Sequence, residues 1–169
     1  AAKKVAEDFP EVKFAILNGS VEQKPNVASY QFTNWQPGYV TGTLAGLITE
    51  TNKIGAIGGQ EIPVIRDALE AFKAGPQRVN PEADVTITYV DSWTDVAKGK
   101  ETALAMIDDG ADVVVTDANA VGLGSIEACK QRGVYAIGFV QDQHDVAPDT
   151  VVASGIQSNQ KLVYYVVDE

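Results

Sequence analysis

Short apolar segments recur along the whole chain, and most are separated by stretches with the spacing of helices. Each segment is apolar at successive positions, so both faces of the corresponding strand would be buried, as in a parallel sheet that helices cover on both sides. The predicted strands span residues 12–17, 26–32, 53–59, 84–90, 112–117, 134–139 and 151–156. This recurrence limits the fold to a small set of α/β architectures.

Helical patterns fill most of the intervals between these strands. The predicted helices span residues 36–50, 63–74, 95–109 and 121–132. Pro63 suits a first helical position, Asp95 suits an N-cap and Gly133 suits a C-terminal stop. The alternation indicates an α/β fold with a doubly wound parallel sheet. In such folds ligands bind beyond the carboxyl ends of the strands.

Residues that directly follow the predicted strands are therefore the candidate ligand-binding residues. Trp93, in the stretch DSWTD, carries an indole that could stack on a flat ligand. Gly59 lies in a turn where its missing side chain would let a ligand or a second lobe approach closely. Asp117 ends a strand and Asn119 follows it. The Asp117 carboxylate could accept hydrogen bonds from a ligand or cap the next helix.

Composition narrows the classes of function. The net charge is −10, from 13 basic and 23 acidic residues, and no basic cluster is present, which argues against nucleic-acid binding. The single Cys, Cys129, is expected to pack within a helix, and with only one His, His144, we expect no zinc site and no cofactor. No apolar run is long enough to cross a bilayer. No nucleophile–base pair indicates an enzyme.

Two further patterns concern the organisation of the chain. Gly38, Gly42 and Gly46 recur at intervals of four and predict close contact between helix 36–50 and the sheet, because Gly is otherwise costly inside a helix. The chain starts like the tail of a helix that runs into a strand and ends like a helix just begun. We therefore expect a fragment of a longer protein.

Several motifs together resemble the basic membrane protein family, the substrate-binding lipoproteins of ABC transporters that are similar to purine nucleoside receptors. They include GGQEIP, VNP, DSWTD, KGK, GADVVV and VYAIGF, and the similarity runs through nearly the whole chain. The resemblance implies a periplasmic-binding-protein fold of type I, in which a ligand lies in a cleft between two lobes. It implies a remnant of the N-terminal lobe at 1–51, the C-terminal lobe at 52–155, and a truncated helix or return crossover at 156–169.

The resemblance also assigns ligand-binding positions. Trp93 occupies a base-stacking position, and Asp117 and Asn119 occupy a loop that is Gly-rich in many relatives. Asp142 and Gln143 match the end of a GVDxDQ-like segment. The first Asp of that segment is replaced here by Val140, which disfavours ribose recognition and favours a free base or another small ring.

Two aromatic residues, Tyr30 and Trp35, follow the last strand of the N-terminal lobe and could face the cleft. The resemblance implies a binding protein without catalysis, which captures a purine-like base or nucleoside and delivers it to a membrane permease. It implies an extracytoplasmic protein, either a membrane-anchored lipoprotein or periplasmic. The alternatives are the ligand-sensing effector domain of a regulator or signalling receptor and, third, an enzyme such as a nucleoside hydrolase.

Overall fold

The computed structural model describes residues 2–23 and 25–168, which form two compact units. The smaller unit comprises residues 2–33 and 158–168, and the larger unit is Asn34–Gln157. The sequence-based division placed helix 36–50 with the N-terminal segment. In the structure this helix belongs to the larger unit instead, because it contacts another helix of that unit along its length. Among the described residues, no helix has both the length and the apolar character needed to cross a bilayer.

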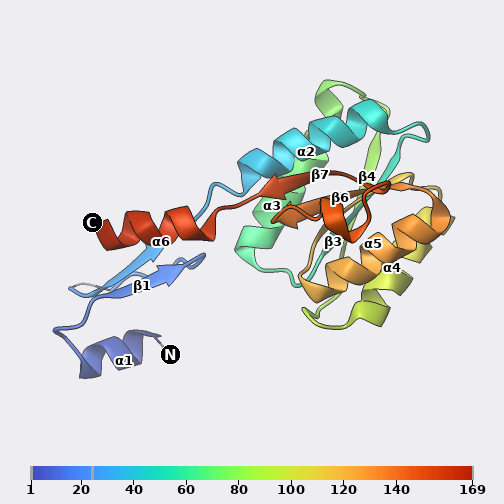
Figure 1. The fold of residues 1–169 in the computed structure, drawn as a ribbon. Coiled ribbons are helices and arrows are strands. Elements are labelled where there is room, and N and C mark those ends of the chain that lie inside the picture. The colour runs from blue at the N-terminus through green and yellow to red at the C-terminus, as the bar shows by residue number, and fades with distance from the viewer. Residues whose placement is uncertain (1, 24, 169) are drawn as a thin grey trace. The chain divides into compact units, whose positions relative to one another are not determined.

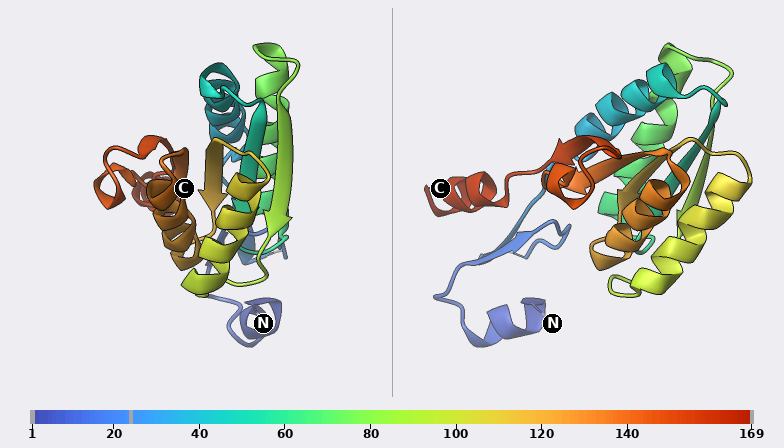
Figure 2. Two further views of the ribbon diagram at one scale, coloured as in Figure 1. Left: turned by 90° about the vertical axis from the view of Figure 1, so that its right-hand side faces the viewer. Right: turned by 45° about the vertical axis from the view of Figure 1, so that its right-hand side comes forward.

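The larger unit is a parallel sheet with helices on both faces (Figure 1, Figure 2). Its five strands lie in the order β4-β3-β5-β6-β7. Their bounds are β3 (Lys53–Gly58), β4 (Asp84–Tyr89), β5 (Val113–Asp117), β6 (Tyr135–Val140) and β7 (Val151–Ile156). The helices are α2 (Trp35–Ile48), α3 (Pro63–Ala74), α4 (Val96–Asp108) and α5 (Ala120–Arg132), with short 3₁₀ helices η1 (Pro76–Arg78) and η2 (His144–Val146).

Alternate side chains of β5, the central strand, belong to two separate hydrophobic cores on opposite faces of the sheet. Val113 and Val115 of β5 belong to the core under α2 and α3, whereas Val114 belongs to the core under α4 and α5. Successive side chains of a strand point to opposite faces, so a sheet covered on both sides needs apolar residues at every position. The predicted fold class is confirmed, including the parallel sheet.

Local signals set the helix ends as predicted. Pro63 opens α3, and Asp95 caps α4 by accepting a hydrogen bond from the backbone N–H of Lys98 at 2.9 Å. Gly133 ends α5 with a φ of +68°, a left-handed conformation that Gly adopts without steric cost. Cys129 is fully buried, as predicted.

The glycines of α2 lie against another helix, not against the sheet, and the prediction of their partner is wrong. A Cβ on Gly38 would collide with the carbonyl oxygen of Ala68, and a Cβ on Gly42 would collide with that of Phe72. Both carbonyls belong to α3, so the two helix backbones nearly touch. The pattern predicted a close approach correctly, but it carried no information about which element approaches.

The two ends of the larger unit meet at a side-chain hydrogen bond. The amide Nε2 of Gln157 donates to Oδ1 of Asn34 at 2.6 Å, although 123 positions separate the two residues. Asn34 is buried and directly precedes α2, while Gln157 directly follows β7. The chain therefore enters and leaves this unit at nearly the same point.

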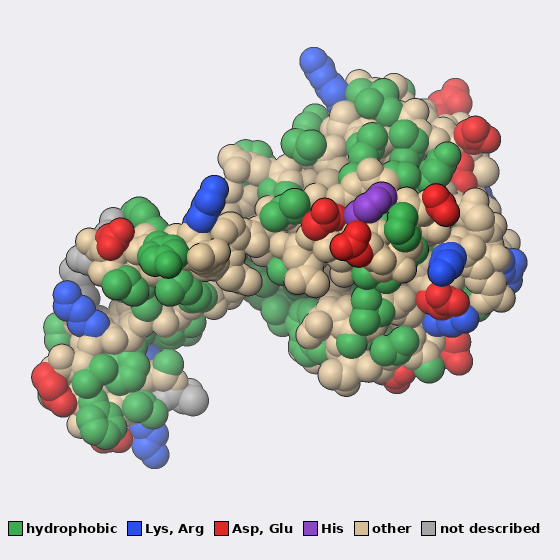
Figure 3. Space-filling model, in the orientation of Figure 1, with side chains coloured by type: hydrophobic (Ala, Val, Ile, Leu, Met, Phe, Trp, Pro, Cys, Tyr) green, Lys and Arg blue, Asp and Glu red, His purple; other side chains and the backbone are tan. Residues whose placement is uncertain are grey.

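The smaller unit contains α1 (Ala2–Asp8), the parallel pair β1 (Phe14–Leu17) and β2 (Val27–Tyr30), and α6 (Asn159–Asp168). The side-chain amide of Asn26 donates to the carbonyls of Ala6, Phe9 and Val12, each at 3.0 Å, and so ties α1 to the sheet. Large apolar side chains gather on its visible surface (Figure 3), and Val167 is 76% exposed.

Candidate ligand-binding site

The carboxyl ends of the strands carry unusual backbone conformations. Asp91, Asn119 and Val140 lie at or just beyond the ends of β4, β5 and β6, with φ values of 57°, 50° and 73°. A positive φ is uncommon for residues other than Gly and is an outlier for a β-branched residue such as Val140. Such strain costs about 1–3 kcal/mol per residue and is concentrated at functional sites in known proteins. This edge is also where ligands of parallel sheets bind.

A pocket of about 440 Å³ opens at this edge, and we call it the edge pocket. Its lining brings together Trp93, Asp117, Asn119 and Gln143, which the sequence predicted from separate segments. Its apolar walls come from α3, α5 and β6; they are Ile65, Leu123, Phe139 and Val140. The convergence follows from the topology, because the loops after β4, β5 and β6 all emerge at the same edge of the sheet.

Trp93 is held in place by the strand ends next to it. Its ring lies against Gly59, where an added Cβ would come within 2.5 Å of Cε3 and Cζ3 of the indole. Its carbonyl accepts from the backbone N–H of Ala120 at 3.1 Å, and the N–H of Ser92 donates to the carbonyl of Gly59 at 3.0 Å. Gly59 itself does not line the edge pocket. Its missing side chain makes room for the indole, which is half-buried.

Asp117 is a buried carboxylate without a partner. It is 5% exposed, and within residues 2–23 and 25–168 no hydrogen bond or ion pair reaches its side chain. Burial raises its pKa to about 7. Asn119, not Asp117, holds the N-cap position of α5, and its side chain makes no capping hydrogen bond. Of the two roles that the sequence left open for Asp117, helix capping is absent here, and the carboxylate remains available to a ligand.

The raised pKa of Asp117 predicts that stability falls as the pH rises. Between the pKa of an unfolded Asp and about 7, the unfolded chain has lost the proton while the folded chain retains it, so ionisation favours unfolding. We expect the free energy of unfolding of Asp117→Asn to exceed that of the wild type by about 2 kcal/mol more at pH 7 than at pH 5. Urea unfolding at both pH values measures this difference. If the difference in free energy of unfolding between Asp117→Asn and the wild type is the same at both pH values, Asp117 is not a buried, unpaired carboxyl.

One polar residue of the pocket lining, Thr116, was not predicted from the sequence. Thr116 Oγ1 and Gln143 Oε1 are both buried and make no hydrogen bond within the described part of the chain. Thr116 interrupts the apolar run VVVTD of β5, which is the signal that could have identified it. The backbone N–H of Gln143 donates to Ser154 Oγ at 3.1 Å, which fixes the loop after β6.

The other predicted residues lie outside the edge pocket. Asp142 is exposed, and its carboxylate accepts from the backbone N–H of His144 at 3.0 Å, a local turn contact. Trp35 begins α2 and is 55% exposed. Tyr30 belongs to the smaller unit, where its ring meets that of Tyr165 edge to face, with centroids 6.3 Å apart.

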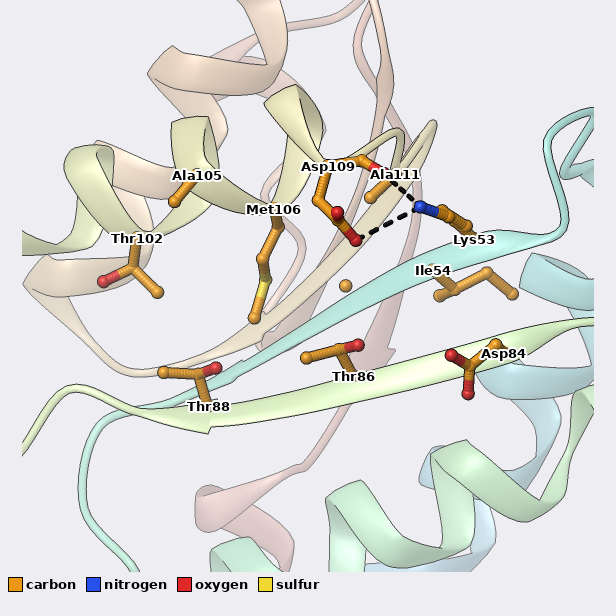
Figure 4. A pocket seen from close by; sticks show the side chains of 11 residues that line it. Lys53, Ile54, Asp84, Thr86, Thr88, Thr102, Ala105, Met106, Asp109 and Ala111 are labelled. Carbon is orange, nitrogen blue, oxygen red and sulfur yellow. Dashed lines mark hydrogen bonds and ion pairs between the residues drawn. The ribbon is translucent and has the colours of Figure 1, made fainter.

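A second pocket lies near the amino ends of β3 and β4, between the edge strand and α4. Figure 4 shows Thr86 and Thr88 on β4 facing Met106 of α4, and the Lys53–Asp109 ion pair, with a Nζ–Oδ2 distance of 3.2 Å, at one end. The charged groups of that ion pair are already satisfied. The edge pocket instead combines an aromatic ring with unpartnered acceptors at the carboxyl ends, and it is the candidate site.

Comparison with known proteins identifies the family. The model of the Bmp family, described as ABC transporter substrate-binding protein PnrA-like, matches residues 1–169. The chain belongs to this family. The Bmp-type motifs of the sequence therefore predicted the family correctly, and the periplasmic-binding-protein-like fold is confirmed by solved structures of solute-binding proteins.

Proteins similar to this Bmp-family chain include a purine-binding protein, a transcriptional activator and a solute-binding protein of an ABC transporter. The purine-binding protein of Brucella abortus is 34% identical over 149 residues, which are 87% of this chain and 41% of that protein. The transcriptional activator protein med of Bacillus subtilis is 31% identical over 165 residues, 98% of this chain and 51% of that protein. The solute-binding protein of an ABC transporter system from Aeropyrum pernix K1 has a TM-score of 0.88 at 28% identity, with 98% of this chain and 50% of that chain covered.

The chain spans about half the length of the curated relatives it matches. It covers 47% of basic membrane protein A2 of Borrelia garinii and 43% of the CD4+ T-cell-stimulating antigen of Listeria monocytogenes. All the residues that line the edge pocket belong to the larger unit, Asn34–Gln157.

Proposed function

We propose that this chain is the solute-capturing part of an ABC importer's binding protein and that its edge pocket holds a purine-like base or nucleoside. One observation carries the proposal: an indole and an unpartnered, buried carboxylate line the same pocket at the carboxyl edge of a parallel sheet. An aromatic face stacks on a flat ring, and a carboxylate fixes the orientation of its edge. A volume of about 440 Å³ is within the range of small-ligand pockets.

A free base suits the pocket better than a nucleoside. Val140 stands where the resemblance implies an Asp that meets a sugar hydroxyl, and it contributes an apolar wall to the pocket. A ribose placed there would lose hydrogen bonds to water without gaining any from this side chain. Because ligand capture requires no bond to break, the protein delivers the solute unchanged to a membrane permease, on the extracytoplasmic side.

A second candidate function is ligand sensing by the effector domain of a regulator. It is favoured by the relationship to med of Bacillus subtilis, which extends over 98% of this chain. Uptake assays on cells that lack this protein separate the two roles. Lost uptake of the solute supports the importer, whereas unchanged uptake with altered transcription supports the sensor.

A panel of nucleobases and nucleosides tests ligand capture. We expect purine-type ligands to give saturable calorimetric heats and to change the fluorescence of Trp93, recorded in a Trp35→Phe background so that one indole reports. Non-planar solutes such as sugars should give neither signal. A chain that is folded by circular dichroism and shows no response to any member of the panel would refute the proposal.

A further inference from the structure

Several polar groups around the edge pocket lack a partner among the described residues. They include the carboxylate of Asp117, the hydroxyl of Thr116 and the side-chain amides of Asn119 and Gln143, and no Lys, Arg or His is among the described residues of the lining. An ionised carboxylate has only acceptor sites and is costly to bury unless donors reach it. Asp117 in its ionised form therefore needs hydrogen-bond donors, and a ligand in the pocket can supply them.

Both oxygens of the buried Asp117 carboxylate lack a partner among the described residues, so a ligand has to reach two acceptors and not one. A carboxylate is satisfied best by two parallel N–H donors from a planar group. A flat ligand offers this arrangement when an exocyclic amino group sits beside a ring N–H. An edge that presents a carbonyl oxygen would instead face a second acceptor and leave the carboxylate unpaired.

Resting on the proposed function, we propose that the ligand is an amino-substituted heterocycle that gives two adjacent N–H donors to Asp117 while its ring stacks on Trp93. Among purines, guanine has this edge, and hypoxanthine is the same ring system without the amino group. Adenine offers a donor beside an acceptor, which matches the protonated form of Asp117, so the ligands are compared at pH 8, above the pKa of about 7, where the carboxylate has only acceptor sites. A phosphorylated ligand is disfavoured, because no cationic side chain is among the described lining residues to offset a phosphate near Asp117.

Paired ligands test this inference with the 169-residue chain. We expect guanine to bind about tenfold or more tightly than hypoxanthine, and guanosine more tightly than inosine, because one hydrogen bond to a charged group is lost. Guanosine 5′-monophosphate should bind more weakly than guanosine. Asp117→Asn replaces one acceptor by a donor at constant shape and should reduce the guanine-to-hypoxanthine ratio to about one. Asp145→Asn, at an exposed carboxylate outside the pocket, is the matched control and should retain the wild-type ratio.

The outcomes separate this inference from the proposed function. If hypoxanthine and guanine bind the wild type equally, or hypoxanthine binds more tightly, the inference is overturned while capture of a purine stands. If Asp117→Asn keeps the preference for guanine, Asp117 is not the group that reads the amino edge, and the inference fails. If no purine binds the folded chain, both fail. The wild-type ratio needs no mutant, so the test survives a variant that does not fold.

Discussion

Replacing Trp93 by Ala is expected to weaken binding of the captured ring by about ten- to a hundredfold. Stacking of a base on an aromatic side chain contributes about 1–3 kcal/mol, and removal of the indole also opens the pocket to water. Trp93 lines the edge pocket and its own position is fixed by Gly59 and by backbone hydrogen bonds to neighbouring segments. Little of its stacking energy is therefore spent on ordering the side chain. Isothermal titration with the tightest purine of the panel measures the loss.

Two variants distinguish stacking from general damage. Trp93→Phe keeps an aromatic face and should retain most of the affinity. Tyr135→Ala removes another aromatic ring at the start of β6, where it is 45% exposed and outside the pocket, and should bind as the wild type does. Equal affinity of Trp93→Ala and wild type would remove the indole from the site.

Replacing Gly42 by Ala should lower the free energy of unfolding by about 3 kcal/mol, although Gly to Ala inside a helix normally stabilises by about 1 kcal/mol. The new Cβ would collide with the carbonyl oxygen of Phe72, which is a backbone atom in the last turn of α3 and cannot turn aside as a side chain could. The two helices would have to separate over a core that includes the fully buried Phe72. Urea unfolding should show a lower midpoint with an unchanged slope.

The matched control for Gly42→Ala lies on the same helix. Val40 is 67% exposed, and Val40→Ala should change the free energy of unfolding by less than about 0.5 kcal/mol. Gly124→Ala repeats the test at the other helix pair, where a Cβ would collide with the carbonyl of Val96 in α4. A Gly42→Ala variant as stable as the wild type would mean that α2 and α3 are not in backbone contact.

The strands and helices of the larger unit could be predicted because their signals are local. The run VVVT of β5 is apolar at successive positions, and the structure buries every residue of that strand. The cap at Asp95 and the stop at Gly133 depend on a few neighbouring residues only. The element that packs against the α2 glycines could not be predicted, because a helix or a sheet that approaches the backbone closely selects the same spacing of small residues.

Four of the twelve residues that line the pocket could be predicted for a topological reason. Trp93, Asp117, Asn119 and Gln143 follow parallel strands, and the carboxyl ends of such strands always meet. Ile65 and Leu123 escaped notice because an apolar residue in a helix looks the same whether it faces a core or a ligand. Asp142 is adjacent to Gln143, yet its carboxylate accepts a hydrogen bond within a local turn. A sequence pattern does not show which of two neighbouring loop residues faces the pocket.

The hydrogen bond between Asn34 and Gln157 has a consequence for domain insertion, because it brings the two ends of the larger unit together. A domain whose two ends lie close together can be inserted into another polypeptide without distortion of the chain at either end. Residues 34–157 have this property, and they carry the whole edge pocket with them. We therefore expect residues 34–157 to keep the geometry of the edge pocket when they are inserted into another protein.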